Sequence, residues 1–343
     1  MNRRILLLLV ITIAGCCLYG QQRLRIMEYN VENLFDTLHA SGLQDEDFTP
    51  TGIQRWNAPR YWGKLGRLAR VIAAAGGHVP VDLVALVEIE NDSVVYDLTR
   101  RTRLRRLGYD YMTATTADVR GMRVALLYQP ARFNPISHSS IRFTPPGNRQ
   151  HPTRDALHVA GELVTGDTLD IIVCHWPSRR GGRASIRHRN SAGKRLRAFC
   201  DSLTGLRERA AIVITGDFNA WYPESCLRQE LGVRPPDGTP PHNDALYLLS
   251  HQAQGADGIR GTYKYQGEWN RLDHFIVNGL LLHTSICPNA LHTSPTYCRI
   301  ADFPFLLQKE KSGKGVRPYR TYLGTFYQGG YSDHLPLILD LFF

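Results

Sequence analysis

Ala211-Ile212-Val213-Ile214-Thr215-Gly216-Asp217-Phe218-Asn219 is the most informative stretch of this sequence, because an apolar run ends abruptly in polar residues. A short run of β-branched residues is typical of a buried strand, and Gly-Asp is typical of the turn that closes it. Short apolar runs with strand character recur at 24–29, 83–87, 124–128, 169–174, 274–277 and 335–341. Most of them also end in a polar residue, so we expect a strand-rich protein.

Two helical patterns lie between these runs, at 62–75 and 192–206, each with apolar residues on one face. Val164-Thr165-Gly166-Asp167 separates two apolar strands and predicts a hairpin, which favours a mixed sheet over a parallel one. We therefore expect a single α/β domain over residues 23–343, with helices covering the sheet faces. The Pro/Gly-rich stretches 145–152, 235–241 and 309–318 are predicted to be surface loops.

The composition excludes disordered and collagen-like chains. The 343 residues are 43% hydrophobic, which is enough apolar material for a large core. The 41 Lys and Arg residues outnumber the 31 Asp and Glu residues, giving a formal net charge of +10. Such a protein attracts polyanions such as nucleic acids or phosphate-rich surfaces.

The N-terminus has the pattern of a signal peptide, which we assign to residues 1–20. Asn2-Arg3-Arg4 precedes an apolar run at 5–14 that is too short for a membrane span of about 20 residues. Ile13-Ala14-Gly15-Cys16 resembles a bacterial lipobox, in which Cys16 would carry a lipid anchor; ordinary cleavage near Gly20 is the alternative. We expect an exported protein, whether periplasmic, secreted or anchored as a lipoprotein, with no transmembrane span in the mature chain and a monomeric state.

Five cysteines remain after the leader, an odd number in a compartment where disulfides form. Their spacing matches no metal-binding motif. Cys287 and Cys298 are the pair that we expect to form a disulfide, whereas Cys174 lies in an apolar strand and is expected to be a buried free thiol.

Polar residues gather where the predicted strands end. The clusters are Glu28-Tyr29-Asn30, Glu88-Ile89-Glu90-Asn91, His175-Trp176-Pro177-Ser178, Gly216-Asp217-Phe218-Asn219, Arg271-Leu272-Asp273-His274 and Ser332-Asp333-His334. Converging strand ends would bring them to one cleft. Carboxylate and amide oxygens suit Mg²⁺ or Mn²⁺, and His–Asp pairs suit proton transfer. The Gly-x-Ser-x-Gly, P-loop and dinucleotide-binding motifs are missing from the sequence, so the pattern favours metal-dependent phosphoester chemistry.

The order of these clusters resembles that of the endonuclease/exonuclease/phosphatase superfamily. The motifs that carry the resemblance are Met27-Glu28-Tyr29-Asn30, Leu86-Val87-Glu88, Gly216-Asp217-Phe218-Asn219, Arg271-Leu272-Asp273 and Ser332-Asp333-His334. That superfamily includes pancreatic deoxyribonuclease, abasic-site endonucleases, sphingomyelinases and inositol polyphosphate 5-phosphatases. The resemblance runs from about residue 24 to the C-terminus, and it implies an α/β fold: a four-layer sandwich of two packed mixed β-sheets flanked by helices.

The resemblance also implies a metal site and a site for water. Glu88 is similar to the principal metal-binding carboxylate of the superfamily, with Asn30 beside it and Asp333 as a further metal contact. Asp217 and Asn219 resemble the pair that orients the attacking water and binds the phosphate.

Two histidines complete the expected catalytic set. His334 resembles the active-site histidine of the superfamily, and Asp273 resembles the carboxylate that orients it. His175 is similar to the second histidine of the deoxyribonuclease-like branch. The acidic partner usual in that branch is replaced here by Met122 and Arg123, so the sequence leaves the partner of His175 open.

Substrate class is suggested by a basic segment directly after His175. Residues 179–197 contain eight Lys and Arg residues and no Asp or Glu. We expect Arg179, Arg180 and Arg183 to contact a nucleic-acid backbone, although a solvated helix face is the alternative for the distal part. The sequence thus predicts an exported Mg²⁺-dependent phosphodiesterase, with Mn²⁺ as the other candidate metal, acting on DNA or RNA with little sequence preference. An inositol-phosphate or lipid phosphoesterase and a non-catalytic binding protein are the alternatives.

Overall fold

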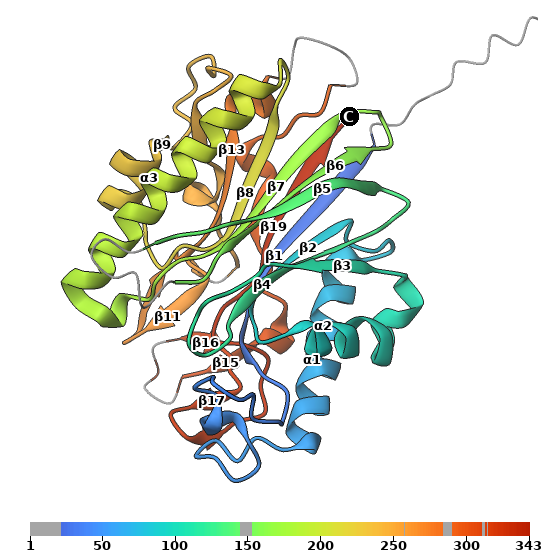
Figure 1. Cartoon of the computed structure of the whole chain (residues 1–343), viewed down its shortest axis with the longest axis vertical. Coiled ribbons are helices and arrows are strands. Elements are labelled where there is room, and N and C mark those ends of the chain that lie inside the picture. The colour runs from blue at the N-terminus through green and yellow to red at the C-terminus, as the bar shows by residue number, and fades with distance from the viewer. Residues whose placement is uncertain (1–21, 145–152, 257, 284–289, 311–312, 314) are drawn as a thin grey trace, which may run out of the picture.

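Two large β-sheets form the centre of the molecule (Figure 1). The computed structural model describes residues 22–144, 153–256, 258–283, 290–310, 313 and 315–343. The first sheet has the order β14-β19-β1-β2-β4-β3, with bounds Cys298–Ile300, Leu337–Phe342, Arg23–Leu34, Leu83–Ile89, Arg123–Tyr128 and Asp110–Thr113. The second has the order β5-β6-β7-β8-β13-β10-β9, with bounds Phe133–Ile141, Ala156–Leu163, Thr168–His175, Ala211–Asp217, Asp273–Asn278, Leu246–Leu248 and Val233–Arg234.

Both sheets are mixed. β1 and β2 run parallel in the first sheet, as do β7 and β8 in the second, while β1–β19 and β8–β13 are antiparallel. β6 and β7 form the hairpin that the 164–167 turn predicts. Each of the seven predicted apolar runs falls within or overlaps one of these strands.

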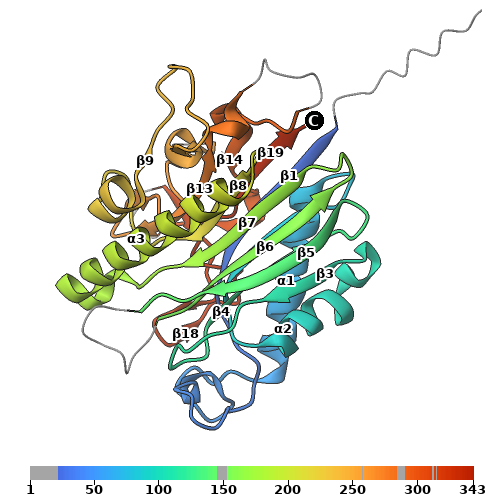
Figure 2. The ribbon, with the colours of Figure 1, turned by 45° about the horizontal axis from the view of Figure 1, so that its top comes forward.

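Helices complete four layers. β1, β2 and β4 of the first sheet pack against β7 and β8 of the second. Helix α1 (Ala58–Gly76) covers the outer face of the first sheet, and α3 (Gly182–Leu206) covers the outer face of the second (Figure 2). A short helix, α2 (Asp92–Tyr96), follows β2. The expected sandwich of two mixed sheets flanked by helices is confirmed.

Both helices begin earlier than their apolar patterns predict. The Asn57 side chain caps α1 by accepting a hydrogen bond from the Arg60 amide at 3.2 Å, and Pro59 stands in the first turn. Helix α3 begins ten residues before Ala192, where its continuous apolar stripe begins. Its first half is solvated on most sides, so hydrophobic periodicity gives little sign of it.

Three small hairpins lie outside the large sheets. They are β11–β12 (Tyr263–Tyr265 and Glu268–Asn270), β15–β16 (Leu307–Lys309 and Val316–Pro318) and β17–β18 (Tyr322–Leu323 and Phe326–Tyr327). The prediction of a plain surface loop at 309–318 is therefore wrong at both of its ends, where the chain is paired. Strands of two or three residues without an apolar run carry no periodic signal.

Cys174 is a buried free thiol, as expected. The predicted signal segment with Cys16, and Cys287 of the expected disulfide, lie outside the described residues. Within the described part of the chain, none of the helices combines the length and the apolar character needed to cross a bilayer.

Candidate active site

One end of the sandwich collects the polar clusters that follow the strands. In the second sheet, His175 at the end of β7 pairs in register with Asp217 at the end of β8, and Asp217 pairs with Asp273 at the start of β13. In the first sheet, Asn30 on β1 and Glu88 on β2 lie at the corresponding end. Because the two sheets pack face to face, their polar ends meet.

The backbone is strained where the polar ends of the two sheets meet. Four of the six non-glycine residues with positive φ in the described ranges belong to it: Glu32 (55°), Asn33 (51°), Glu88 (68°) and Asn219 (48°). Each such residue costs about 1–3 kcal/mol, and such residues cluster at functional sites. Here the unusual conformations aim hydrogen-bond donors: the Asn33 amide donates to Glu88 Oε2 at 2.7 Å.

Asn30 joins the two sheets through their carboxylates. Its Nδ2 donates to Glu88 Oε1 at 3.2 Å and to Asp217 Oδ2 at 3.1 Å. On the other side of Asp217, Asn219 donates its backbone amide to Oδ1 at 2.8 Å and its Nδ2 to Oδ2 at 3.1 Å. Asp217 is fully buried, and burial, followed by the neighbouring Asp273, raises its pKa to about 7.

His334 is held by Asp273. The distance from His334 Nδ1 to Asp273 Oδ2 is 2.7 Å, and Thr262 Oγ1 donates to the same carboxylate oxygen. Burial alone would lower the pKa of His334, but Asp273, Asp333 and Asp217 together raise it well above its usual value. The imidazole is therefore protonated at neutral pH, with Nδ1 donating to Asp273 and Nε2 left for a ligand.

Glu28 is a buried acid that the sequence reasoning did not single out. Burial, followed by Asp273, raises its pKa well above its usual value. Glu28 Oε1 and Oε2 and Asp273 Oδ1 find no other hydrogen-bond partner in the described residues, so a protonated Glu28 is placed to donate to Asp273. A signal was present in the sequence, because strand alternation puts Glu28 on the same face as Asn30.

His175 faces carboxylates on one side and cations on the other. Its Nε2 lies 3.8 Å from Glu88 Oε1 and 4.0 Å from Asp217 Oδ2, while Nδ1 has no hydrogen-bond partner among the described residues. Burial, followed by Arg154 and Arg120, lowers its pKa well below the usual value, so the ring is neutral. The structure thus places two arginines near this histidine, and the sequence reasoning had identified neither of them.

Asp333, which the sequence suggests as a further metal contact, forms an ion pair with Arg320. Its Oδ2 accepts a hydrogen bond from Arg320 Nη2 at 2.6 Å, and Arg320 Nε lies 3.6 Å from Glu32 Oε1. The structure therefore gives Asp333 an arginine partner, and its expected metal contact stays a prediction.

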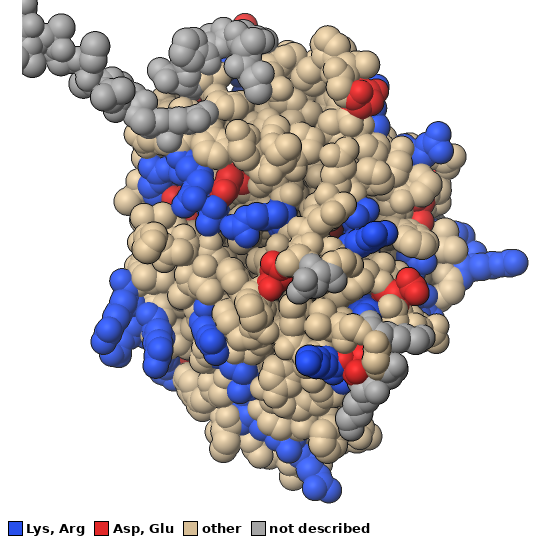
Figure 3. Space-filling view, turned by 180° about the vertical axis from the view of Figure 1, so that it is seen from behind, with Lys and Arg blue, Asp and Glu red and all other residues tan. Residues whose placement is uncertain are grey.

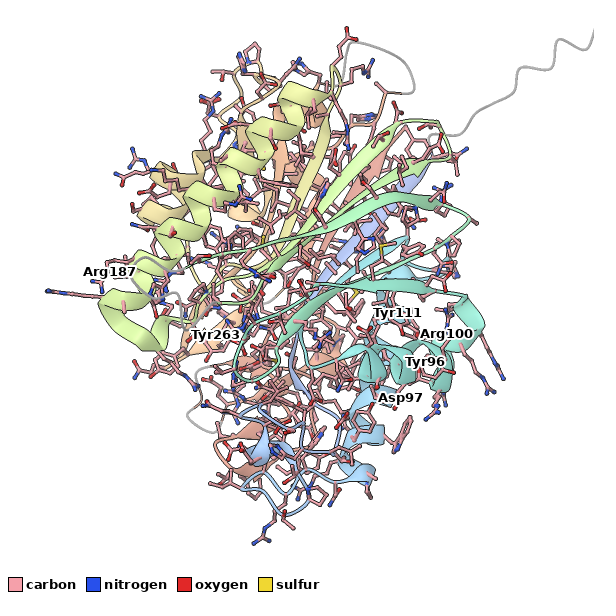
Figure 4. The ribbon with its side chains drawn as sticks, in the orientation of Figure 1. Tyr96, Asp97, Arg100, Tyr111, Arg187 and Tyr263 are labelled. Atoms are coloured by element: carbon pink, nitrogen blue, oxygen red, sulfur yellow. The ribbon has the colours of Figure 1, made fainter. Side chains whose placement is uncertain are left out.

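The three arginines expected to bind substrate have different surroundings. Arg179 forms an ion pair with Glu224 and lies over the ring of Trp221, so its charge is already compensated. Arg180 lines a cavity of about 450 Å³ together with Arg120 and Arg320. Arg183 is exposed in the first turn of α3. Further along this helix, Arg187 extends away from the body of the protein (Figure 4).

The donor set fits a hard divalent cation. Glu88, His175 and Asp217 offer one ligand atom each within 4.8 Å of one another, as do Asp217, Asp273 and His334. The second set contains an ion pair that is already hydrogen-bonded, so Glu88 and Asp217 are the better candidates. Asp217 is a buried carboxylate with a raised pKa, and a divalent ion beside it would offset the cost of burying its charge.

Comparisons with known proteins show the family of this chain and its fold. The Endonuclease/Exonuclease/phosphatase family model matches residues 25–342. The human Nocturnin catalytic domain has a TM-score of 0.55 at 18% identity, over 94% of this chain and 98% of that one. A D. rerio TDP2 humanised by 14 mutations has a TM-score of 0.54 at 17% identity, over 93% and 98% of the two chains.

An endonuclease/exonuclease/phosphatase from Bacteroides vulgatus has a TM-score of 0.57 at 13% identity, over 93% of this chain and 98% of that one. At such identities the solved structures show the shared fold alone, and the search of curated proteins found no match. The family model, in contrast, spans nearly all of the chain and every strand end described above. On that ground the chain belongs to the endonuclease/exonuclease/phosphatase family.

Proposed function

We propose that this protein is a divalent-metal-dependent phosphodiester hydrolase, and more specifically a nuclease that cleaves DNA or RNA with little sequence preference. The observation that carries the proposal is that Glu88 and Asp217, from different sheets, share Asn30 beside the paired Asp273 and His334. Members of the family are generally hydrolases of phosphodiester bonds and use divalent metals. One relative, D. rerio TDP2, has been solved complexed with a single strand DNA product.

The residues divide the work of an in-line attack by water. A metal ion held by Glu88, with Asn30 beside it, would supply positive charge to the phosphate oxygens. Asp217 and Asn219 position the water, and Asp217 would share the ion with Glu88. Protonated His334 donates from Nε2 to a phosphate oxygen and stabilises the charge that develops there.

The positive charge of the protein supports a polyanionic substrate. Figure 3 shows Lys and Arg side chains in several groups over one face of the molecule, in keeping with the net charge of +10. Near the site, Arg120, Arg180 and Arg320 line one cavity, which also contains Asn33, the residue that donates to Glu88. Cations beside a phosphate-cleaving centre provide the sequence-independent part of nucleic-acid binding.

Export is part of the proposal and depends on the sequence of residues 2–20 alone. We likewise propose that residues 23–343 act as one catalytic domain. Cell fractionation, with the mass of the processed protein, tests export and separates cleavage at Cys16 from cleavage near Gly20.

A substrate panel tests the activity. The purified protein is incubated with supercoiled DNA, linear DNA, RNA, sphingomyelin and inositol phosphates, with Mg²⁺ or with EDTA. We expect cleavage of nucleic acid that requires Mg²⁺, is lost in His334→Ala and persists in His138→Ala, a matched change of an exposed histidine. Cleavage of sphingomyelin or inositol phosphates alone would replace the nuclease proposal with the phosphoesterase alternative, and no cleavage of any substrate would favour a binding protein.

A further inference from the structure

The three small hairpins enclose a groove that the catalytic residues do not use. β11–β12, β15–β16 and β17–β18 line a cavity of about 970 Å³, and β11 packs beside β16 (Figure 1). Arg320 and Asp333 also line the groove, and Asp333 directly precedes His334 in the chain. At the same end, the ring of Tyr263 at the start of β11 lies 4.9 Å from the His334 ring, centroid to centroid (Figure 4 labels Tyr263).

Aromatic rings from two different hairpins face this groove. Tyr265 is 58% exposed and Phe326 is 72% exposed, and both line the cavity. A single exposed aromatic residue needs no explanation, but two in one groove beside a reaction centre indicate a ligand with flat apolar faces. Nucleobases have such faces, and they stack on aromatic side chains with little dependence on sequence.

The charge of the groove is positive. Its two acids are already engaged, since Glu310 pairs with Lys264 and Asp333 pairs with Arg320. Lys309 is exposed, and Arg317 has a buried Nε without a hydrogen-bond partner in the described residues. These two cations are placed to contact the phosphates of a strand whose bases stack on the rings.

We propose that this groove binds single-stranded nucleic acid and leads the strand to the phosphodiesterase site. The inference rests on the proposed function and names its preferred substrate. A duplex keeps its base faces stacked inside the helix, whereas a single strand can present them to Tyr265 and Phe326. The cavity is at the upper end of the roughly 300–1,000 Å³ that drug-sized ligands fill, so it exceeds the needs of a single phosphate headgroup.

Binding measured without turnover tests the groove separately from catalysis. Fluorescence anisotropy in EDTA compares labelled oligothymidylate with a labelled duplex, for wild type and for the Tyr265→Ala/Phe326→Ala double variant. Loss of stacking on one base weakens binding by about 5-fold to 150-fold. We expect at least about a tenfold loss for the single strand and less than about twofold for the duplex. Tyr96→Ala, a change of another exposed tyrosine on α2, should bind as wild type does.

A charge variant gives a second, independent readout. Lys309→Gln/Arg317→Gln should flatten the salt dependence of single-strand binding by about 0.7 units of slope for each lost contact. Unchanged affinity in the aromatic variant and unchanged slope in the charge variant would overturn the proposal. So would preferential binding of sphingomyelin vesicles that the aromatic variant loses, because Phe326 would then be a membrane contact.

The proposed function fails by a different measurement. Wild-type hydrolysis of bis(p-nitrophenyl) phosphate with Mg²⁺ reports on the phosphodiesterase site without filling the groove. Hydrolysis together with equal binding of single strand and duplex would overturn the groove alone. Absence of hydrolysis of any phosphodiester, together with aromatic-dependent strand binding, would overturn the catalytic proposal and leave the groove standing.

Discussion

Asp217 should make the metal-free protein less stable as the pH rises, and Asp217→Asn should remove that effect. The carboxyl group is fully buried between Asn30 and Asn219, and burial raises its pKa from 3.8 to about 7. In the unfolded chain the same group titrates near its ordinary value of about 3.9. Between these two pKa values the folded state holds a proton that the unfolded state has lost.

The sign and size of the effect follow from linkage. Stability falls with pH wherever the folded state binds more protons, so this group destabilises the protein progressively from about pH 4 to about pH 7. A shift of about three pKa units corresponds to about 4 kcal/mol, fully developed above pH 7. At about 2 °C for each kcal/mol in a domain of this size, the melting temperature should change by about 5–10 °C.

Thermal melts of wild type and Asp217→Asn in EDTA, from pH 5 to pH 8, measure this directly. The difference between the two proteins cancels most contributions from other groups, and the variant should gain stability over wild type as the pH rises. Asp201→Asn removes an exposed carboxylate on α3 and should show no such trend. A difference between Asp217→Asn and wild type that stays flat with pH would refute the argument.

Metal binding should reverse the loss of stability that Asp217 causes as the pH rises. A ligand that binds the folded state alone, present at 100 times its Kd, adds about 2.7 kcal/mol. Mg²⁺ should therefore stabilise wild type more at pH 8 than at pH 5, because the ligands must lose their protons to bind it. Asp217→Asn should respond weakly at both pH values. Equal stabilisation of the variant and wild type at pH 8 would show that Mg²⁺ binds elsewhere.

Three further changes test the division of roles. Glu88→Gln should raise the Mg²⁺ concentration needed for half-maximal activity, because a neutral amide attracts a hard cation less than a carboxylate does; wild-type activity at limiting Mg²⁺ would contradict this. His334→Ala should lower turnover by about 10²-fold or more with an unchanged circular dichroism spectrum, and unchanged turnover would make the Asp273–His334 pair structural. Arg180→Ala should weaken duplex DNA binding and reduce the salt slope of that binding by about 0.9 units. Arg179→Ala should change the slope less because Glu224 already compensates the charge of Arg179, and equal slopes in the two variants would count against Arg180 as a phosphate contact.

The hydrophobic pattern of the sequence predicted the central strands because each of them is a short, nearly continuous apolar run. A strand that is buried on both faces has such a run whichever strands lie beside it in the sheet. They gave no strand order, since which strands become neighbours depends on contacts far apart in sequence. The order β7-β8-β13 joins segments up to about a hundred residues apart. The four-layer architecture was accessible only through the resemblance of ordered motifs.

The site residues at the strand ends could be predicted from the sequence, but the residues that surround them could not. Asn30, Glu88, Asp217 and the Asp273–His334 pair stand in recognisable motifs, and the structure brings them together. Arg154 stands in no motif, and its ion pair with Asp118 spans 36 residues. Lys64 looks like an ordinary helical lysine, yet it is completely buried and donates to the Glu32 carbonyl oxygen and to Thr321 Oγ1. A partner that is distant in sequence leaves no local pattern to read.

The strained segment near the end of β1 connects the proposed metal site with the proposed strand groove. At Asn33, the backbone amide is committed to Glu88. At Glu32, one residue earlier, the carboxylate accepts hydrogen bonds from the Thr321 amide at 2.6 Å and the Tyr322 amide at 3.3 Å, which fixes the chain between Arg320 and β17. Buried Lys64 contacts both segments, because it donates to the Glu32 carbonyl oxygen and to Thr321 Oγ1. Its positive charge offsets part of the cost of burying the Glu32 carboxylate, whose pKa rises to about 7. Asn33 thus holds the Glu88 carboxylate of the proposed metal site, and Glu32 holds the segment that forms one wall of the groove. Because these two neighbouring residues share a costly backbone conformation, the groove and the reaction centre keep a fixed relation to each other.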